Sequence, residues 1–447
     1  MSRSLRDPIC ACATPWGFGA IAVVRVSGPD LAPLITAVCG PLPRPRAVRL
    51  ARLRDAAGVF DDGLVTWMPG PISYTGEDVA EISCHGNPLL VERLLEALCA
   101  RGARPASPGE FTRRAFLNGR MDLTRAEAVL QAIAATSPAG LAVARAGLDG
   151  RVTARIDALR DALVDVAAEL EAILDYPGED LLVASDAELA ARLDVVAADA
   201  AAAVAGHRAG LVAVEGAKVA LVGPVNAGKS SLFNALLGRT RALVSPTPGT
   251  TRDVVESALP LDTMRVLLYD TAGERDAVDP IEAAGLALAA AMVEEADLLL
   301  VVLPGHHPLD DVGAAILART AARPHLVVVT HADLHRALAL PDSVDAIEVA
   351  IPTGGGLEAL RAALPRALRG EDPGEVAGLV ASQRQRDAYA RLGANAAAAA
   401  AALREGGGPA VAVERVYEAL ASLDVLVGRD TREAVLDRLF SRFCIGK

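Results

Sequence analysis

The stretch Lys218-Val-Ala-Leu-Val-Gly-Pro-Val-Asn-Ala-Gly-Lys-Ser-Ser231 decides the fold of this chain. In it Gly223 and Gly228 are separated by four residues and followed by Lys229 and Ser230, which is the phosphate-binding loop pattern. An apolar run precedes the loop and helical periodicity follows it, so the pattern stands between a strand and a helix. In such a loop, backbone N–H groups and the N-terminus of the helix face the phosphates of the nucleotide. Lys229 would then contact the β- and γ-phosphates, and the Ser230 hydroxyl would ligate Mg²⁺. A glycine turn with a chance lysine is the alternative, and it leaves the flanks and the spacing unexplained.

Length and composition set limits on the rest of the chain. Its 447 residues exceed what one hydrophobic core usually serves, and with 3% aromatic residues and many alanines a helix-rich protein of two or three domains is expected. The net charge of −12 provides no general basic field, so any contact with RNA must be local or shared with a partner. The six cysteines have neither zinc-site nor secreted-disulfide spacing, and no signal peptide or membrane-spanning run is found. A cytoplasmic protein without a membrane association is therefore predicted.

Three domains are predicted from the periodicity along the chain. Residues 1–121 read as an α+β domain, with strands at 20–28 and 80–86 and an amphipathic helix at 88–100. Residues 215–368 alternate apolar strands with helices, as in a doubly wound sheet, and lie inside a helical domain made of residues 122–214 and 369–447. The expected strands of the inserted domain are Val219–Val222, Arg265–Tyr269, Leu298–Val302, Leu326–Val329 and Ile347–Ala350, with helices at Ile281–Val293, Asp311–Ala322 and Leu357–Leu368. The expected helices of the helical domain are Arg125–Ala135, Leu141–Tyr176, Ser185–His207, Ser382–Leu403, Ala410–Val425 and Arg432–Phe443.

Elements downstream of the phosphate loop favour GTP over ATP. Asp270-Thr-Ala-Gly273 follows a strand, where a GTPase places its second Mg²⁺ aspartate and its γ-phosphate-sensing glycine, and Gly249-Thr-Thr251 can add a hydroxyl to the Mg²⁺ shell. Thr330-His-Ala-Asp333 ends the fourth strand, and the Asp333 carboxylate can accept both hydrogen bonds from the guanine edge. Threonine and His331 stand there in place of the usual asparagine and lysine. Guanine preference is therefore expected to survive, whereas the affinity is left open, as is the closing Ser-Ala element, whose nearest match is Val349-Ala350.

The catalytic arrangement departs from many regulatory GTPases. Glu274-Arg-Asp276 follows the Asp270–Gly273 element, and no glutamine is near to orient the attacking water. Asn226 in the phosphate loop can help hold a monovalent cation where an arginine finger would otherwise act. It can equally be a side chain that stabilises the loop, and the sequence alone does not decide between the two.

Motifs outside the inserted domain carry a resemblance to a known family. They are Asp7-Pro-Ile-Cys-Ala-Cys-Ala-Thr-Pro15, Val24-Arg-Val-Ser-Gly-Pro29, Tyr74-Thr-Gly-Glu-Asp78, Pro108-Gly-Glu-Phe-Thr-Arg-Arg-Ala-Phe-Leu-Asn-Gly-Arg-Met-Asp-Leu-Thr124 and the ending Phe443-Cys-Ile-Gly-Lys447. Together with the inserted GTPase unit, they resemble the MnmE (TrmE) tRNA modification GTPases over essentially the whole chain. The resemblance implies a potassium-activated GTP hydrolase with a Ras-like inserted G domain, an N-terminal domain that binds a tetrahydrofolate derivative of the 5-formyl type and dimerises, and a discontinuous helical domain. It also implies a homodimer that works with the FAD-dependent partner MnmG on tRNA, whose wobble uridine is carboxymethylaminomethylated.

The resemblance also assigns roles to individual residues. Ser230 and Thr251 correspond to the Mg²⁺ ligands, and Glu282 to the carboxylate that orients the water, beside Asn226 and Lys229 in catalysis. The potassium site falls on Asn226, Ser245, Thr247 and Thr250, and folate contacts fall on Arg25, Glu81, Arg120 and Lys447. The implied GTP contacts are Asn226, Ala227, Gly228, Lys229, Ser230, Ser231, Ser245, Pro246, Thr247, Pro248, Gly249, Thr250, Thr251, Asp270, Thr271, Ala272, Gly273, Thr330, His331, Ala332 and Asp333. Arg120 stands where the family more often has lysine, and Cys444 is a possible nucleophile that can as well be inert.

Two alternatives to this enzyme are kept. A switch GTPase of the ribosome-assembly type would bind a partner when loaded with GTP and do no chemistry on RNA, but it needs neither the folate-like motifs nor the Phe443–Lys447 ending. A scaffold with a decayed G domain draws only on His331 and the altered closing element. Turnover of GTP by the purified chain separates the scaffold from the other two.

Overall fold

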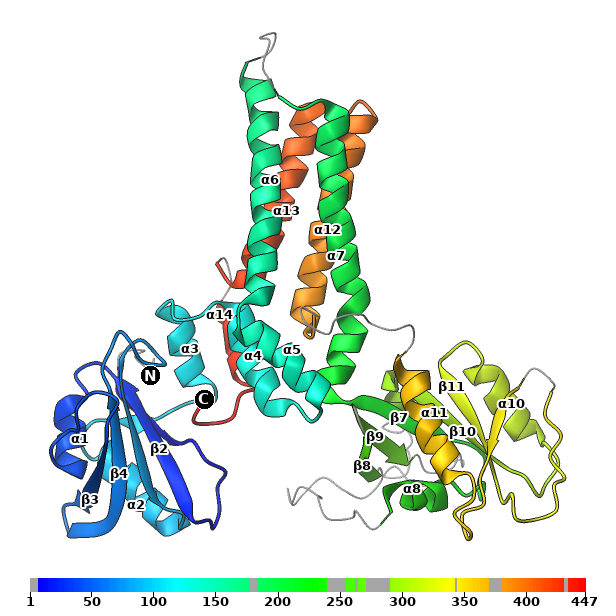
Figure 1. The fold of residues 1–447 in the computed structure, drawn as a ribbon, viewed down its shortest axis with the longest axis horizontal. Coiled ribbons are helices and arrows are strands. Elements are labelled where there is room, and N and C mark those ends of the chain that lie inside the picture. Colours follow the sequence, from blue (N-terminus) through cyan, green and yellow to red (C-terminus); the bar gives the residue numbers. More distant parts are fainter. Residues whose placement is uncertain are drawn as a thin grey trace. The chain divides into compact units, whose positions relative to one another are not determined.

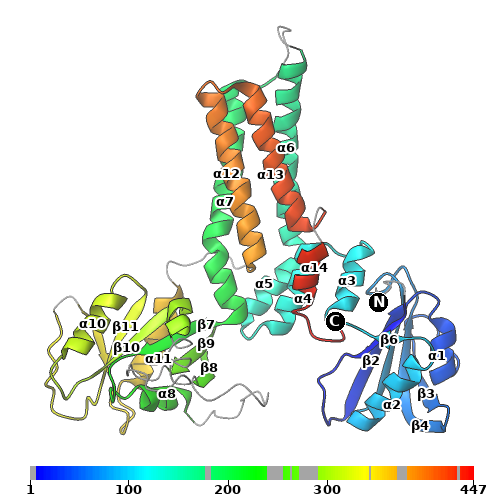
Figure 2. The same cartoon turned by 180° about the vertical axis from the view of Figure 1, so that it is seen from behind.

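The computed structural model describes residues 7–176, 183–238, 255–261, 264–270, 290–341, 344–369, 380–429 and 433–447 (Figures 1 and 2). Within these residues the chain divides into two compact units. The first comprises Met1–Leu130, Gly147–Ala198 and Ala388–Lys447, and the second comprises Gln131–Ala146 and Asp199–Asp387. The boundaries of the three domains expected from the sequence stay a prediction.

A six-stranded sheet forms the N-terminal part of the first unit, with the order β3-β4-β5-β2-β1-β6. The strands are β1 (Ile9–Cys12), β2 (Ile21–Gly28), β3 (Val48–Asp55), β4 (Gly58–Met68), β5 (Asp78–His85) and β6 (Arg104–Pro105), and the helices are α1 (Ala32–Cys39), α2 (Pro88–Cys99) and α3 (Glu110–Leu117). The two strands and the helix expected from the sequence are confirmed. Two helices were expected in this part, of which only α2 was given a range; the β3–β4 hairpin, α1 and α3 were not placed from the sequence.

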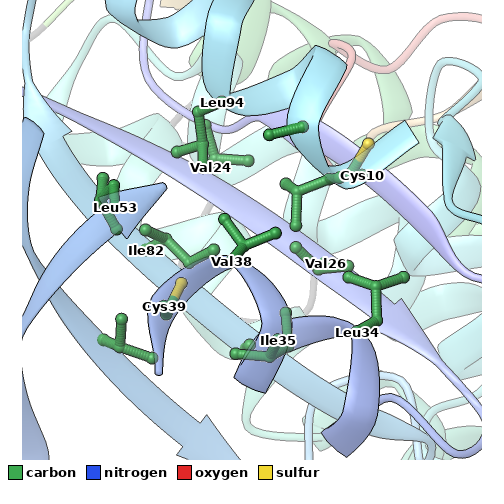
Figure 3. Close-up of a cluster of buried hydrophobic side chains, with 14 of the residues drawn as sticks. Cys10, Val24, Val26, Leu34, Ile35, Val38, Cys39, Leu53, Ile82 and Leu94 are labelled. Atoms are coloured by element: carbon green, nitrogen blue, oxygen red, sulfur yellow. The ribbon is translucent and has the colours of Figure 1, made fainter. Parts of the chain in front are cut away.

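The two faces of this sheet are packed differently because side chains alternate along each strand. Val24, Val26 and Ile82 point to one face, where they form a core with residues of α1 and α2 (Figure 3). Asn87 is the N-cap of helix α2, and its side-chain oxygen accepts a hydrogen bond from the Leu89 amide at 3.0 Å. Ile9 and Ala11 point to the other face and pack against Phe111 of α3. Helix α3 thus covers the face on which Arg25, the cross-strand partner of Ala11, also lies.

Helix α3 is fixed by a buried ionic network at its first turn. The Glu110 carboxylate, 6% exposed, accepts from Arg104 Nη2 at 2.6 Å, from Arg114 Nη2 at 3.0 Å and from the Ser107 amide at 2.9 Å. Burial raises the pKa of the Glu110 carboxyl, but these hydrogen bonds outweigh it and bring the pKa to about 2. Since Arg114 also donates to Glu77 at 3.0 Å, the network connects α3 to the loop that precedes β5.

The helical elements follow the expected order, with one division and several bounds that differ. They are α4 (Leu123–Ala134), α5 (Pro138–Leu148), α6 (Arg151–Asp175), α7 (Asp186–Glu215), α12 (Gln383–Arg404), α13 (Gly408–Val427) and α14 (Glu433–Phe440). The single helix expected at Leu141–Tyr176 is wrong, because Gly150 takes a left-handed φ of 80° and separates α5 from α6. Helix α7 also continues beyond His207. Helices α6 and α13 lie side by side (Figures 1 and 2), joined by Arg160 Nη2, which donates to Asp424 at 2.6 Å.

The second unit contains the doubly wound sheet that the phosphate loop predicted. Its strand order is β12-β11-β10-β7-β9-β8, all parallel except β8. The elements are β7 (Ala217–Val222), α8 (Lys229–Leu237), β8 (Val255–Leu261), β9 (Met264–Asp270), β10 (Leu298–Pro304), α10 (Asp311–Thr320), β11 (His325–Thr330), β12 (Ala346–Glu348) and α11 (Leu357–Arg369). All five expected strands are found, and β8 is an additional edge strand. Of the helix expected at Ile281–Val293, residues 290–293 are helical and the rest lies outside the described residues.

Helices cover both faces of this second sheet. Leu221, Leu300 and Val328 belong to a core shared with α8 and α11. Val301, Leu303 and Val329 belong to a core that includes Ile316 of α10 on the opposite face. The fold class predicted from the sequence, an α/β unit of this type beside α+β and helical parts, is therefore confirmed. In the described part of the chain, no helix combines the length and the apolar character that crossing a membrane would require.

Candidate nucleotide-binding site

The phosphate loop connects β7 to α8 at the carboxyl edge of the second sheet. Gly228, the residue that precedes α8, has a φ of 86°, and Asn226 has a φ of 61°, so two backbone units of the loop are left-handed. A Cβ at Gly223 would lie 2.2 Å from the Val302 carbonyl oxygen, which explains the glycine at the start of the loop. Asn226, Ser230 and Ser231 are exposed, so their side chains are open to a ligand at the loop.

Lys229 is the buried cation of the loop. Its side chain is 7% exposed, and its Nζ donates to the carbonyl oxygens of Gly223 and Pro224 at 2.8 Å each. The ammonium group is therefore bent back over the loop that carries it. A positive charge held in this place meets the charge on the phosphates of a bound nucleotide.

The Thr330–Asp333 segment lies directly against this loop. The Thr330 hydroxyl is fully buried and donates to the Ala227 carbonyl at 2.7 Å, and it lies 3.2 Å from the Leu303 carbonyl. Thr330 thus braces the loop from the position where the usual motif has asparagine. His331 has a φ of 59°, Ala332 donates its amide to Val349 at 3.3 Å, and the Asp333 side chain is exposed. The expected base-reading segment, its closing element and the phosphate loop are therefore brought together.

The other residues expected to contact the nucleotide lie outside the described residues, except for the backbone of Asp270. Ser245, Pro246, Thr247, Pro248, Gly249, Thr250, Thr251, Thr271, Ala272, Gly273 and Glu282 lie outside the described residues. Asp270 is described by its backbone only. It is the last residue of β9 and pairs with Leu221 of β7, which places it beside the phosphate loop at the same edge of the sheet. Their roles stay predictions.

Sequence reasoning missed two histidines at this edge. His306 and His307 follow β10, and the His306 ring contacts the ring of His331, with centroids 4.4 Å apart. The sequence held one signal: strands β10 and β11 were both predicted, and parallel neighbours end at the same edge. Residues that follow them directly are therefore close in space.

The residues expected to contact folate lie near one another in the first unit. Arg25 Nη2 and Nε donate to Glu81 Oε1 at 2.7 and 2.9 Å, across the β2–β5 pair. Arg25 Nη1 donates to the Gly446 carbonyl at 3.2 Å, and the guanidinium lies 5.5 Å from the Tyr74 ring centroid. The C-terminal residues thus pack onto the N-terminal sheet.

Lys447 and Arg120 complete this second group. Burial lowers the pKa of Lys447, and Arg25 lowers it further, against the opposing effect of Glu81. Arg120 Nε donates to the Ser73 carbonyl at 3.1 Å, next to Tyr74. All four expected folate residues therefore lie around one loop and the end of the chain, while Cys444 is exposed and its thiol is free.

Comparisons with known proteins cover nearly the whole chain. The family model described as the N-terminus of the GTP-binding protein TrmE matches residues 8–120, and that of the MnmE helical domain matches residues 123–444. The tRNA modification GTPase MnmE of Halorhodospira halophila is 45% identical, covering 99% of this chain and 96% of that protein. The MnmE proteins of Akkermansia muciniphila and of a Thermus thermophilus strain are each 41% identical, covering 99% and 100% of this chain and 100% of theirs. Identity at this level along nearly the full length of each protein shows that the chain belongs to the MnmE (TrmE) family of tRNA modification GTPases.

Proposed function

We propose that this chain hydrolyses GTP to drive the carboxymethylaminomethylation of the wobble uridine of certain tRNAs, as a cytoplasmic homodimer in complex with the FAD-dependent partner MnmG. The observation that carries the GTPase part is the arrangement of Lys229 and Thr330 on one loop, with Asp333 exposed at the end of the segment that Thr330 begins. Lys229 supplies a fixed charge for phosphates, Thr330 holds the loop, and Asp333 offers two acceptor oxygens to a guanine edge.

The metal ions of this proposal fit the described part of the site. Ser230 is exposed in the first turn of α8, where a hydroxyl can ligate Mg²⁺, with Thr251 as the second protein ligand. Asn226 is exposed in the same loop with a left-handed backbone, and we assign its side-chain oxygen to K⁺ together with Ser245, Thr247 and Thr250. Bound cations would stabilise the negative charge that develops during phosphoryl transfer. Glu282 is the proposed guide of the attacking water.

The function is tested on the tRNA of a deletion strain. We expect mass spectrometry of its tRNA nucleosides to show loss of the carboxymethylaminomethyl group from wobble uridine, restored by the wild-type gene and not by Lys229→Ala. The purified wild-type chain should hydrolyse GTP faster in K⁺ than in Na⁺ at equal ionic strength. Unchanged wobble uridines with active GTP turnover would instead favour the switch GTPase, and an inactive purified chain would favour the scaffold.

The one-carbon donor is proposed to be a tetrahydrofolate derivative bound at Arg25. The group offers two cations, Arg25 and Lys447, the Glu81 carboxylate, and the ring of Tyr74. A folate presents carboxylates, a planar ring and ring N–H groups, and these match such a set of partners. Arg120, on the Ser73 carbonyl, is the second cation proposed for the glutamate tail.

Substituting Arg25→Ala should weaken the binding of 5-formyltetrahydrofolate by about tenfold or more, because a charge-assisted hydrogen bond of the Arg25 guanidinium is lost. Calorimetry on the intact protein measures this change, while GTP turnover should stay at the wild-type rate. Arg52→Ala is the matched control, since Arg52 lies on the same sheet with a side chain that is 76% exposed. Equal affinity of the wild type and Arg25→Ala would show that folate binds elsewhere.

A further inference from the structure

Three histidines gather where β10 and β11 end. Pro304 of β10 pairs with Thr330 of β11, so the residues that follow, His306 and His331, leave the sheet at neighbouring points. The amide of Gly305 donates to the Thr330 carbonyl at 2.9 Å and fixes the two chain segments to each other. The spacing of the histidines is therefore set by the sheet itself.

The His306 ring stands edge-on to the His331 ring. Their centroids are 4.4 Å apart with an interplanar angle of 64°, and the His306 and His307 rings are 4.0 Å apart at 47°. Such edge-to-face geometry is favourable for neutral rings. Burial lowers the pKa of His306, and His307 and His331 lower it further, which favours the neutral form of the ring. In the described part of the chain, His306 Nδ1 is buried without a hydrogen-bond partner, so packing is what this ring contributes.

His331 in turn lies on the phosphate loop. Its Nδ1 is 3.1 Å from the Thr330 hydroxyl, and a Cβ placed on Gly228 would lie 3.6 Å from its Cε1. The left-handed backbone at His331 turns the chain between Thr330, which braces the loop, and Asp333, which is exposed. Here the lysine methylenes of the usual motif would cover the base, and an imidazole ring is present instead.

We propose that His306 is a positioning residue for the guanine base: its ring holds the His331 ring against the phosphate loop, where His331 forms the surface on which the base stacks. Stacking of a purine on an aromatic ring contributes to binding but not to the chemical step at the γ-phosphate. Loss of the His306 ring therefore frees His331 and lowers affinity for the nucleotide. The proposal rests on the proposed GTPase function.

The test measures GTP kinetics and GDP calorimetry on the full-length protein. His306→Ala should raise KM for GTP and Kd for GDP by about fivefold, with kcat within twofold of the wild type. His306→Phe, which keeps an aromatic ring in place, should restore both values. His325→Ala is the matched control, because His325 begins β11 at the opposite end of the strand and contacts the Arg323 carbonyl at 2.9 Å. It should behave as the wild type.

A double-mutant cycle separates positioning from a general structural effect. His331→Ala alone should weaken GDP binding about tenfold, and adding His306→Ala should then change little, because the ring that His306 positions is absent. Additive effects of the two substitutions would overturn the proposal, as would wild-type affinity in His306→Ala or failure of His306→Phe to restore it. If instead the wild type binds neither GTP nor GDP, the proposed GTPase function itself fails.

Discussion

Lys229→Ala should lower kcat/KM for GTP on the order of 1,000-fold, the size of effect found when a fixed charge that meets a transition state is removed. The Lys229 ammonium is 7% exposed and donates to the carbonyls of Gly223 and Pro224 at 2.8 Å each, so the loop itself fixes the position of this charge. Alanine removes this charge from the place where the phosphates bind. Turnover is measured by phosphate release at saturating and subsaturating GTP.

Lys218→Ala provides the matched control for this substitution. Lys218 lies on β7, eleven positions before Lys229, and its Nζ donates to Glu295 at 2.7 Å on the protein surface. Removing a surface ion pair costs roughly 0–1 kcal/mol of stability and should leave turnover within twofold of the wild type. Alanine at Lys229 leaves two buried carbonyls with one donor fewer, so thermal unfolding of each variant is recorded as well. A folded Lys229→Ala protein with wild-type kcat/KM would contradict the assignment of the loop.

The phosphate loop was predictable because its signals are local. Two glycines, a lysine and a serine are close in sequence, and the flanking periodicities are set by which face of a strand or helix is buried. The structure adds why the first glycine is needed: Gly223 faces the Val302 carbonyl of a strand that comes about eighty residues later. This contact forms only in the folded protein, and the sequence shows only that the position is a glycine.

The sequence did not predict the break between α5 and α6 or the strand β8, because in both places the tertiary structure overrides the local sequence pattern. Apolar periodicity continues through residues 141–176, and a glycine inside a helix costs only about 1 kcal/mol, so Gly150 does not by itself mark a helix end. Strand β8 contains Pro260 and pairs only with β9 among the described strands, as an edge strand does. Its pairing is set by the neighbouring strand β9, and the sequence of β8 alone does not show that partner.

The Thr330–Asp333 segment shows how the fold compensates for a departure from a motif. The sequence left the guanine affinity open because threonine replaces the usual asparagine, and the Thr330 hydroxyl reaches the Ala227 carbonyl at 2.7 Å. His331 replaces a lysine and packs against His306, a residue that no motif includes. The Thr330–Ala227 and His331–His306 contacts each join segments that follow different strands. They are therefore visible in the folded sheet and not in the sequence.

Asp333→Asn should change the preference of the enzyme from GTP to XTP, with the ratio of the two kcat/KM values moving on the order of 1,000-fold or more. A carboxylate accepts hydrogen bonds from both N1–H and the 2-amino group of guanine, whereas an amide has a single acceptor oxygen and turns an NH₂ group toward the other position. Xanthine carries a carbonyl in place of the amino group, so it matches that NH₂. Guanine instead leaves a donor facing a donor, which is costly in a closed site.

The experiment compares GTP and XTP turnover by the wild type, by Asp333→Asn and by Asp345→Asn. Asp345 is also exposed and lies between β11 and β12, so its substitution removes the same charge from the same unit without touching the Thr330–Asp333 segment. We expect Asp345→Asn to keep the wild-type preference, because a surface charge carries no information about the base edge. If Asp333→Asn kept that preference as well, Thr330–Asp333 would not be the segment that reads the base. Loss of turnover with both nucleotides would place Asp333 in support of the loop, since a base-reading carboxylate affects the choice of nucleotide and leaves the chemistry at the γ-phosphate intact.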